Sequence, residues 1–205
     1  DCPGQETVYG LYVPPAPAED GAPAAVENLN ASFTDNSLVG KVAFTAPTAT
    51  YAGGTLSGQL SYYVMVGNDT LATGKTYPGA FVRETVTVPE GVTTFRVTTA
   101  NEVGSSPENK VKVYVGNDEP TQVKDVNLAI DPETGVAKLT WSPVTTGING
   151  GYIGNITYNV VRYPDSTTVA TGLAATEFTE TFSAEEPLQT YSYGVAAVND
   201  TQTGV

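Results

Sequence analysis

The stretch Lys41-Val42-Ala43-Phe44 is matched by Lys138-Leu139-Thr140-Trp141, which follows it at an offset of 97 residues. In both stretches an aliphatic residue and an aromatic residue alternate with smaller or polar ones. This period of two is typical of a β-strand with one buried face. We therefore expect one strand-rich module to occur twice, with Phe44 and Trp141 at matching places in the two cores.

The repeat extends well beyond this stretch. The further matches are Val26-x-x-Leu29 with Val123-x-x-Val126, Gly53-Gly54 with Gly150-Gly151, Leu60-x-Tyr62-x-Val64 with Ile156-x-Tyr158-x-Val160, and Ala72-Thr73-Gly74 with Ala170-Thr171-Gly172. They keep their order while the offset drifts by a residue or so. Ordered matches with small drift indicate two copies of one module, each under 100 residues.

Alternating segments separated by turns rich in Gly, Asn, Asp and Pro predict the strands. No segment shows a helical stripe of apolar residues. One apolar and one polar face favour antiparallel sheets packed as a sandwich. The expected strands are 29–33, 42–44, 60–66, 85–88, 95–99 and 110–115 in copy one, and 126–130, 139–141, 156–160, 176–181 and 191–197 in copy two.

The domain boundaries follow from the repeat and from two Pro-containing segments. Residues 1–23 are expected to form an N-terminal strand and a Pro-rich linker, and residues 24–116 the first domain. The short polar segment 117–120 is interpreted as a linker and residues 121–205 as the second domain.

Copy two stops after its expected strand at 191–197, whereas copy one closes with one more strand at 110–115. The second sandwich should therefore have an unpaired edge, which is a liability in water. Residues 7–13 offer a spare strand, because Leu11-Tyr12-Val13 resembles Val113-Tyr114-Val115. We prefer the interpretation that the 205 residues are an excised piece of a longer chain, in which residues 1–13 are the tail of an upstream module and the missing last strand of copy two lies downstream. The alternative is that they pair with an exposed sheet edge, as strand addition allows.

The motifs resemble fibronectin type III modules. In that family a Trp on the second strand packs under the two sheets, and Trp141 matches it while Phe44 replaces it in copy one. The family's sixth strand is similar to Tyr191-x-Tyr193-x-Val195-x-Ala197-Val198-Asn199. The resemblance implies an all-β chain of two immunoglobulin-like (fibronectin type III) β-sandwiches in tandem, the second lacking its last strand. Such modules act as scaffolds and spacers, so the family implies little about function.

Composition excludes several classes of function. Nine basic and 22 acidic residues give a net charge of −13, which argues against a nucleic-acid partner. The chain has no His, so Ser-His-Asp catalysis and His-ligated metal sites are excluded. Its single Cys, Cys2, excludes internal disulfides, and no apolar run is long enough for a membrane helix.

Two carboxylates suffice for glycoside hydrolysis, but the acidic residues here fall in no recognisable motif. We expect them on turns or outward strand positions, as a solvated face that keeps the protein soluble. The chain is therefore predicted not to be an enzyme and to need no cofactor. The acids concerned are Asp35, Glu84, Glu90, Asp131, Glu133, Glu177, Glu180, Glu185 and Glu186.

Asn117, Asp118 and Glu119 form a run of oxygen-bearing side chains that suits calcium. Calcium takes six to eight oxygen ligands, and only three candidates are contiguous. An ordinary hinge is the preferred interpretation of this run, and no metal site is predicted.

Tyr51 and Tyr152 lie in loops beside the two Gly pairs, and Tyr77 lies beside Pro78-Gly79. Exposed aromatic rings stack on sugars or anchor proteins, so these three are the candidate ligand contacts. The simpler alternative, which we prefer, is that each ring folds back to cover the open end of its sandwich.

A narrower resemblance, in the tandem pair and the Gly150-Gly151-Tyr152-Ile153 insertion, is to modules of large secreted or surface-anchored bacterial proteins. It implies a monomeric or weakly associated binding or spacing module, extracellular or on the outer cell surface, that meets a protein or glycan ligand. Membrane contact is expected only through a possible lipid on Cys2. The alternative is an accessory module of a carbohydrate-active enzyme whose catalytic domain lies outside this chain.

Overall fold

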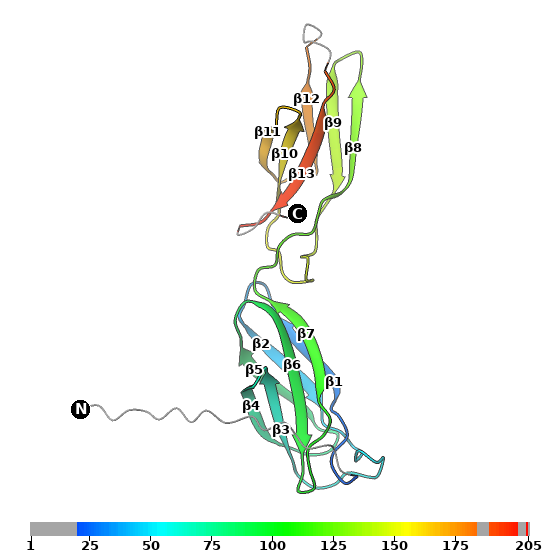
Figure 1. Cartoon of the computed structure of the whole chain (residues 1–205), viewed down its shortest axis with the longest axis vertical. Coiled ribbons are helices and arrows are strands. Elements are labelled where there is room, and N and C mark those ends of the chain that lie inside the picture. The colour runs from blue at the N-terminus through cyan, green and yellow to red at the C-terminus, as the bar shows by residue number, and fades with distance from the viewer. Residues whose placement is uncertain (1–19, 184–188, 201–203, 205) are drawn as a thin grey trace, which may run out of the picture. The chain divides into compact units, whose positions relative to one another are not determined.

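A computed structural model describes residues 20–183, 189–200 and 204 (Figure 1). All regular elements within these residues are β-strands, so the predicted all-β fold class is confirmed. The chain divides into two compact units, the first ending at Val113 and the second beginning at Tyr114. The expected strand at 7–13, the Pro-rich linker up to Glu19 and Cys2 lie outside the described residues.

Unit 1 is a sandwich of two antiparallel sheets with strand orders β1-β2-β5 and β4-β3-β6-β7. The alternation of apolar residues selects the faces that meet, because side chains along a strand point to opposite sides. The strands are β1 (Glu27–Phe33), β2 (Val39–Thr45), β3 (Leu60–Val66), β4 (Asp69–Thr76), β5 (Phe81–Thr87), β6 (Gly91–Ala100) and β7 (Asn109–Val115).

Aromatic pairs join the two sheets of unit 1. The ring of Phe44 on β2 meets that of Tyr62 on β3 edge-on at 5.6 Å, and Phe33 on β1 stacks on Phe95 of β6 at 5.9 Å. Phe44 is fully buried. Such pairs bury large apolar area and add directional contact energy, so they fix how one sheet lies on the other.

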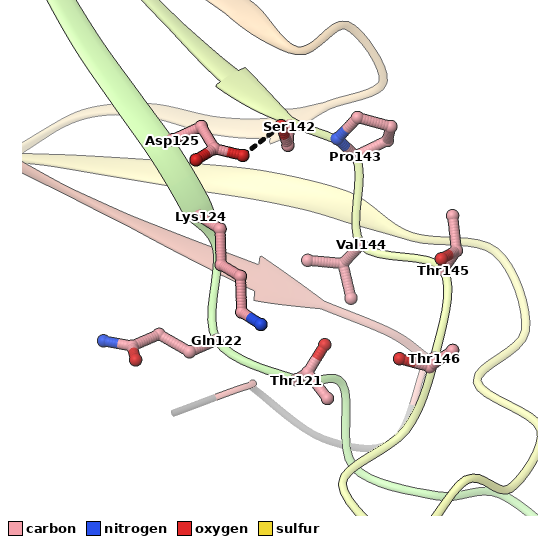
Figure 2. A pocket seen from close by; sticks show the side chains of 9 residues that line it. All are labelled: Thr121, Gln122, Lys124, Asp125, Ser142, Pro143, Val144, Thr145 and Thr146. Atoms are coloured by element: carbon pink, nitrogen blue, oxygen red, sulfur yellow. Dashed lines mark hydrogen bonds between the residues drawn. The ribbon is translucent and has the colours of Figure 1, made fainter.

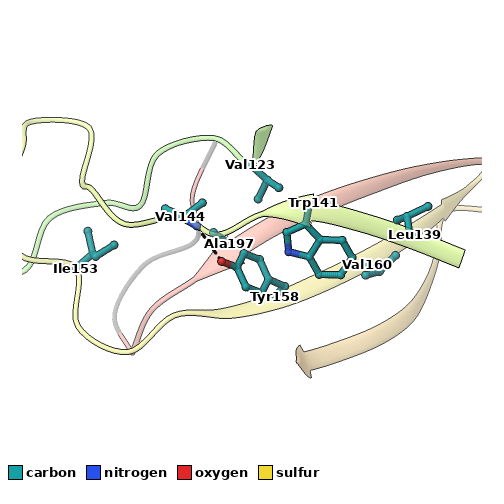
Figure 3. Close-up of a cluster of buried hydrophobic side chains, with 8 residues drawn as sticks. All are labelled: Val123, Leu139, Trp141, Val144, Ile153, Tyr158, Val160 and Ala197. Carbon is teal, nitrogen blue, oxygen red and sulfur yellow. Dashed lines mark hydrogen bonds between the residues drawn. The ribbon is translucent and has the colours of Figure 1, made fainter. Parts of the chain in front are cut away.

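Unit 2 repeats this arrangement with sheets β12-β9-β8 and β11-β10-β13. Trp141 on β9 meets Tyr158 on β10 edge-on at 5.3 Å and is 5% exposed, at the centre of the apolar cluster in Figure 3. The expected burial of both Phe44 and Trp141 is thus confirmed. The strands are β8 (Lys124–Asp131), β9 (Val136–Ser142), β10 (Thr157–Tyr163), β11 (Thr167–Leu173), β12 (Glu177–Thr181) and β13 (Ser192–Val198).

The repeat read from the sequence also appears in the hydrogen bonds. The backbone N–H of Ala24 donates to Ala49 in unit 1, as that of Thr121 donates to Thr146 in unit 2. The side-chain amide of Asn101 donates to the carbonyl of Gly21, as that of Asn199 donates to the carbonyl of Asp118. Asp118 therefore stands at the position of Gly21 in unit 1, which becomes important below.

Several sequence expectations need correction. Strands β4 and β11 were not expected, because their Thr- and Gly-rich sequences lack apolar alternation. Segment 117–120 does not act as a free linker: the N–H of Asp118 donates to the carbonyl of Tyr152, and the N–H of Ile148 donates to that of Glu119. It is built into unit 2 as the edge of a loop. Among the described residues of unit 2, the sheet ending in β13 has three strands, where unit 1 has four.

Candidate functional site

The loops at one end of unit 1 carry two of the candidate tyrosines. The N–H of Tyr51 donates to the carbonyl of Ala22, and the N–H of Ala46 donates to that of Ala80. These bonds and the one from Asn101 to Gly21 tie four connections together. We call residues 20–24, 46–59, 77–80 and 101–106 the loop end of unit 1.

The long loop from β2 to β3 is held in one shape by its own contacts. Gly53, at φ +86°, closes a turn by donating its N–H to the carbonyl of Thr50, and the N–H of Gly54 donates to Oγ1 of Thr50 at 3.0 Å. A positive φ is a conformation that Gly adopts without strain. Leu56 is buried against Ala46 and Leu60 and closes the end of the sandwich.

Because Leu56 covers the core here, the tyrosine rings are left outside. Tyr51 is 56% exposed and Tyr77 is 59% exposed, and the hydroxyl of Tyr77 accepts a 3.4 Å hydrogen bond from the side-chain amide of Gln59. The preferred expectation that these rings fold back over the sandwich is wrong for both. Two phenol rings on a hydrogen-bonded framework suit stacking on a flat apolar face at little cost in ordering.

Tyr152, the third candidate, is 42% exposed and belongs to a different kind of loop. Its loop wraps around the side chain of Asp118, which is fully buried. Oδ2 accepts hydrogen bonds from the N–H groups of Asn149 at 2.8 Å and Gly151 at 2.9 Å, and Oδ1 accepts from Nδ2 of Asn149 and from the N–H of Glu119, both at 2.9 Å. Asp118 thus positions the loop that presents Tyr152.

This geometry disfavours the calcium interpretation of residues 117–119. The carboxylate that calcium would need accepts hydrogen bonds from N–H donors on both oxygens, and those donors would have to leave. Throughout the described residues there is also no group of three or more acidic or Cys side chains suited to a metal ion. Asp118 is a structural anchor for its loop.

Two acidic residues that were expected on solvated faces are partly buried instead. Glu84 on β5 accepts a short hydrogen bond from the hydroxyl of Tyr62, and Glu180 on β12 accepts one of 2.8 Å from that of Tyr193 on β13. Each pair joins the two sheets of its unit. The bond to Glu84, together with burial, raises the pKa of Tyr62 to about 12.

Arg162 adds to this cluster in unit 2. Its guanidinium pairs with Asp165 at 2.8 Å and with Glu180, and lies 4.9 Å from the centre of the Tyr191 ring. The hydrogen bond from Arg162 to Asp165 is the main reason why the pKa of the Asp165 carboxyl is lowered to about 2. These acids are engaged in holding strands together, which is a structural use of a carboxylate.

A small polar pocket of about 170 Å³ lies beside the start of β8 (Figure 2). It forms where β8 bulges at Asp125, whose φ is +56°, and where the hydroxyl of Ser142 donates to Asp125 at 2.7 Å. Asn28 makes the same bulge in unit 1 and bonds Thr45. The sequence did not lead us to expect this pocket. The signal for the shared bulge was that Asn28 and Asp125 stand at matching places in the repeat.

Comparisons with known proteins return only structures. No protein-family model matches the chain, and no curated protein matches it. Among solved structures, the FN1–FN3 domains of chicken CNTN1 align at 15% identity and a TM-score of 0.40, over 89% of this chain and 64% of that one. The central fibronectin-III array of RIM-binding protein aligns at 17% identity and a TM-score of 0.38, over 91% and 62%. The chain spans less than two thirds of either structure.

Each unit is a sandwich of two antiparallel β-sheets, as the strand pattern of the sequence indicates. Within residues 20–183, 189–200 and 204, there is no helix with the length and apolar character needed to cross a bilayer.

Proposed function

We propose that the chain is a non-enzymatic binding and spacing module that meets a protein or glycan partner through the loop end of unit 1. The carrying observation is the exposure of Tyr51 and Tyr77 on loops that backbone hydrogen bonds hold in place. Preformed aromatic anchors lose little freedom on binding, and such anchors account for most of the affinity at protein interfaces.

The surrounding chemistry supports the same proposal. The net charge of −13 disfavours nucleic acid and anionic membrane surfaces as partners. Glu84 and Glu180, the partly buried acids that could have served catalysis, bond to tyrosines across the two sheets. We further propose a location outside a bacterial cell or on its outer surface, on the resemblance to modules of bacterial surface proteins.

The test is a glycan array and a pull-down on intact bacterial and host surfaces, both with the full chain. A Tyr51→Ala, Tyr77→Ala double variant should lose at least about tenfold in apparent affinity, since each lost anchor costs over about 1 kcal/mol. Tyr63→Ala is the matched control, because Tyr63 is also exposed but lies on β3. Binding that survives in the double variant, or that Tyr63→Ala removes equally, would contradict the proposal. The proposal would also be contradicted if the unaltered chain bound no glycan and no protein in either assay.

A further inference from the structure

The loop end of unit 1 exposes an aliphatic side chain as well as the two tyrosine rings. Val103, in the turn after β6, is 49% exposed. A Cβ placed on Gly21 would lie 3.2 Å from both Cγ atoms of Val103, so this side chain lies against the segment 20–24. The N–H of Tyr51 donates to the carbonyl of Ala22, in the same segment, at 2.7 Å. Val103 and Tyr51 therefore flank one stretch of backbone.

Tyr77 joins this surface through the neighbouring loop. A Cβ placed on Gly79 would lie 3.3 Å from the methyl carbon of Thr48, which precedes Tyr51 in the loop from β2 to β3. The loops that follow β2 and β6 gather at the same end of unit 1 (Figure 1). We call Tyr51, Tyr77 and Val103 the exposed patch. Large side chains that are exposed together on a fixed framework mark a place where a protein meets a partner.

The polar side chains around the exposed patch favour a protein partner over a glycan. A site that orients a small polar ligand such as a sugar needs side-chain groups that are free to bond it. In the loop end the two side-chain amides are already engaged: Asn101 bonds to three backbone groups, and Gln59 bonds to the hydroxyl of Tyr77. An aliphatic side chain such as Val103 gains most from burial against another apolar surface, which a protein provides.

The charges of the loop end indicate the sign of the partner. The loop end contains two acidic residues, Asp20 and Glu102, which are both exposed, and it contains no Lys or Arg. The cations nearest to it along β4 and β5 are engaged on their sheets. Lys75 donates to a serine hydroxyl on β3 at 2.7 Å, and the guanidinium of Arg83 lies 5.8 Å from the centre of an aromatic ring on its own strand. With a net charge of −13 on the chain, the exposed patch lies in a negative potential.

We propose that the loop end binds a protein whose contact surface is basic and partly apolar, an inference that rests on the proposed function. Lys and Arg side chains of such a partner would pair with Asp20 and Glu102. They would also be attracted to the faces of the two tyrosine rings, because the face of an aromatic ring carries negative partial charge. Apolar side chains of the partner would cover Val103. Opposite potentials on the two surfaces speed their encounter and disfavour acidic proteins.

A library of random dodecapeptides displayed on phage, selected on the immobilised full chain, provides the probe. The recovered peptides should be richer in Lys, Arg and apolar residues than the unselected library. Synthetic copies of these peptides should bind the chain more weakly at high than at low salt concentration, since salt screens attraction between exposed charges. Fluorescence anisotropy measures the binding of each labelled peptide.

Charge variants test the two acids directly. Asp20→Lys with Glu102→Lys should weaken the binding of the recovered peptides by about tenfold or more, because attraction becomes repulsion. Asp69→Lys with Glu90→Lys is the matched control: it changes the net charge equally, at exposed positions outside the loop end, and should bind like the unaltered chain. Val103→Ser should weaken binding severalfold, because it removes apolar contact area. Circular dichroism checks that every variant is folded.

The outcomes separate this inference from the proposed function. Peptides that lose binding in the Tyr51→Ala, Tyr77→Ala double variant but bind both charge variants equally would overturn the basic partner and leave the loop end as the site. A chain that retains glycans through the two tyrosines and selects no peptide would show that the partner is a glycan. Recovery of no peptide therefore overturns the inference. Peptides whose binding depends neither on the tyrosines nor on the acids would contradict the inference and the proposed function together.

Discussion

Asp118 and Asn149 are joined by two hydrogen bonds, one from the backbone N–H of Asn149 to Oδ2 at 2.8 Å and one from its side-chain amide to Oδ1 at 2.9 Å. Gly151 and Glu119 add one bond each to the same carboxylate. All four donors are neutral, so the buried charge is stabilised by oriented N–H dipoles. Hydrogen bonds to charged groups are stronger than neutral ones, and the carboxylate fixes the loop that carries Tyr152.

Asp118→Ala should therefore lower the free energy of unfolding of unit 2 by about 2–4 kcal/mol, because it leaves several buried N–H groups without acceptors. Urea unfolding followed by Trp141 fluorescence measures this directly, since the single Trp of the chain lies in unit 2. Glu133→Ala, at an exposed turn of the same unit, is the control and should change stability by less than about 0.5 kcal/mol. Equal effects of the two substitutions would contradict the anchoring role.

Calcium should leave the urea midpoint of unit 2 unchanged. A ligand that binds only the folded state raises stability with its concentration, and the carboxylate of Asp118 is already occupied by N–H donors. The measurement compares unfolding curves in excess calcium and in chelator. A midpoint that rises with calcium and stops rising in Asp118→Ala would restore the calcium interpretation of residues 117–119.

The two Gly pairs of the repeat should respond differently to an added methyl group. A Cβ on Gly151 would lie 2.5 Å from the ring of Tyr114 and 2.9 Å from Cβ of Asp118, whereas one on Gly54 would meet only Oγ1 of Thr50, at 3.2 Å. Gly151→Ala should therefore destabilise unit 2 by about 1–3 kcal/mol, as overpacking does, and Gly54→Ala should cost unit 1 less. Thermal unfolding of both variants, followed by circular dichroism, compares the two losses of stability. A larger loss of stability for Gly54→Ala than for Gly151→Ala would contradict this prediction.

The sequence predicted the sandwich because its central strands alternate clearly, as around Phe44 and Trp141. It did not predict β4 and β11, which lie at the edges of their sheets, where Thr and Gly suffice. The role of Asp118 was also missed. Its partners Asn149 and Gly151 lie more than 30 residues away, and a local run of acidic residues indicates nothing about such contacts. Tyr51 is exposed because Leu56, in the same loop, covers the end of the core in its place, and the sequence does not indicate which of the two side chains does so.

Trp141→Ala should cost unit 2 about 3–5 kcal/mol, enough to unfold a module of marginal stability. Its ring packs against Tyr158 within a cluster of buried apolar side chains. Trp141→Phe should cost less, because Phe44 fills the matching place in unit 1. Both losses are measured by circular dichroism during urea unfolding. A loss for Trp141→Ala that is no larger than that for Trp141→Phe would show that the ring is not central to the core.

The Tyr62–Glu84 bond between the sheets of unit 1 should make stability fall with alkaline pH. The hydroxyl of Tyr62 donates to Glu84, which, with burial, raises its pKa to about 12, while in the unfolded chain a Tyr ionises near its ordinary value of about 10. Above about pH 10 the unfolded state releases this proton first, so the unfolded state is favoured as the pH rises. The contribution of the bond is therefore complete below about pH 10 and is lost between about pH 10 and pH 12.

Tyr62→Phe isolates this contribution, because the other tyrosines ionise alike in both proteins. The excess stability of the unaltered chain over Tyr62→Phe should be constant up to about pH 10 and shrink towards pH 12. Urea unfolding of unit 1, followed by circular dichroism at closely spaced pH values, measures the difference. Glu84→Ala removes the acceptor of the Tyr62 hydroxyl, which is the largest cause of the raised pKa, so the pH-dependent loss should be smaller in that variant. An excess that stays constant through this range would mean that Tyr62 ionises no later in the folded chain than in the unfolded one.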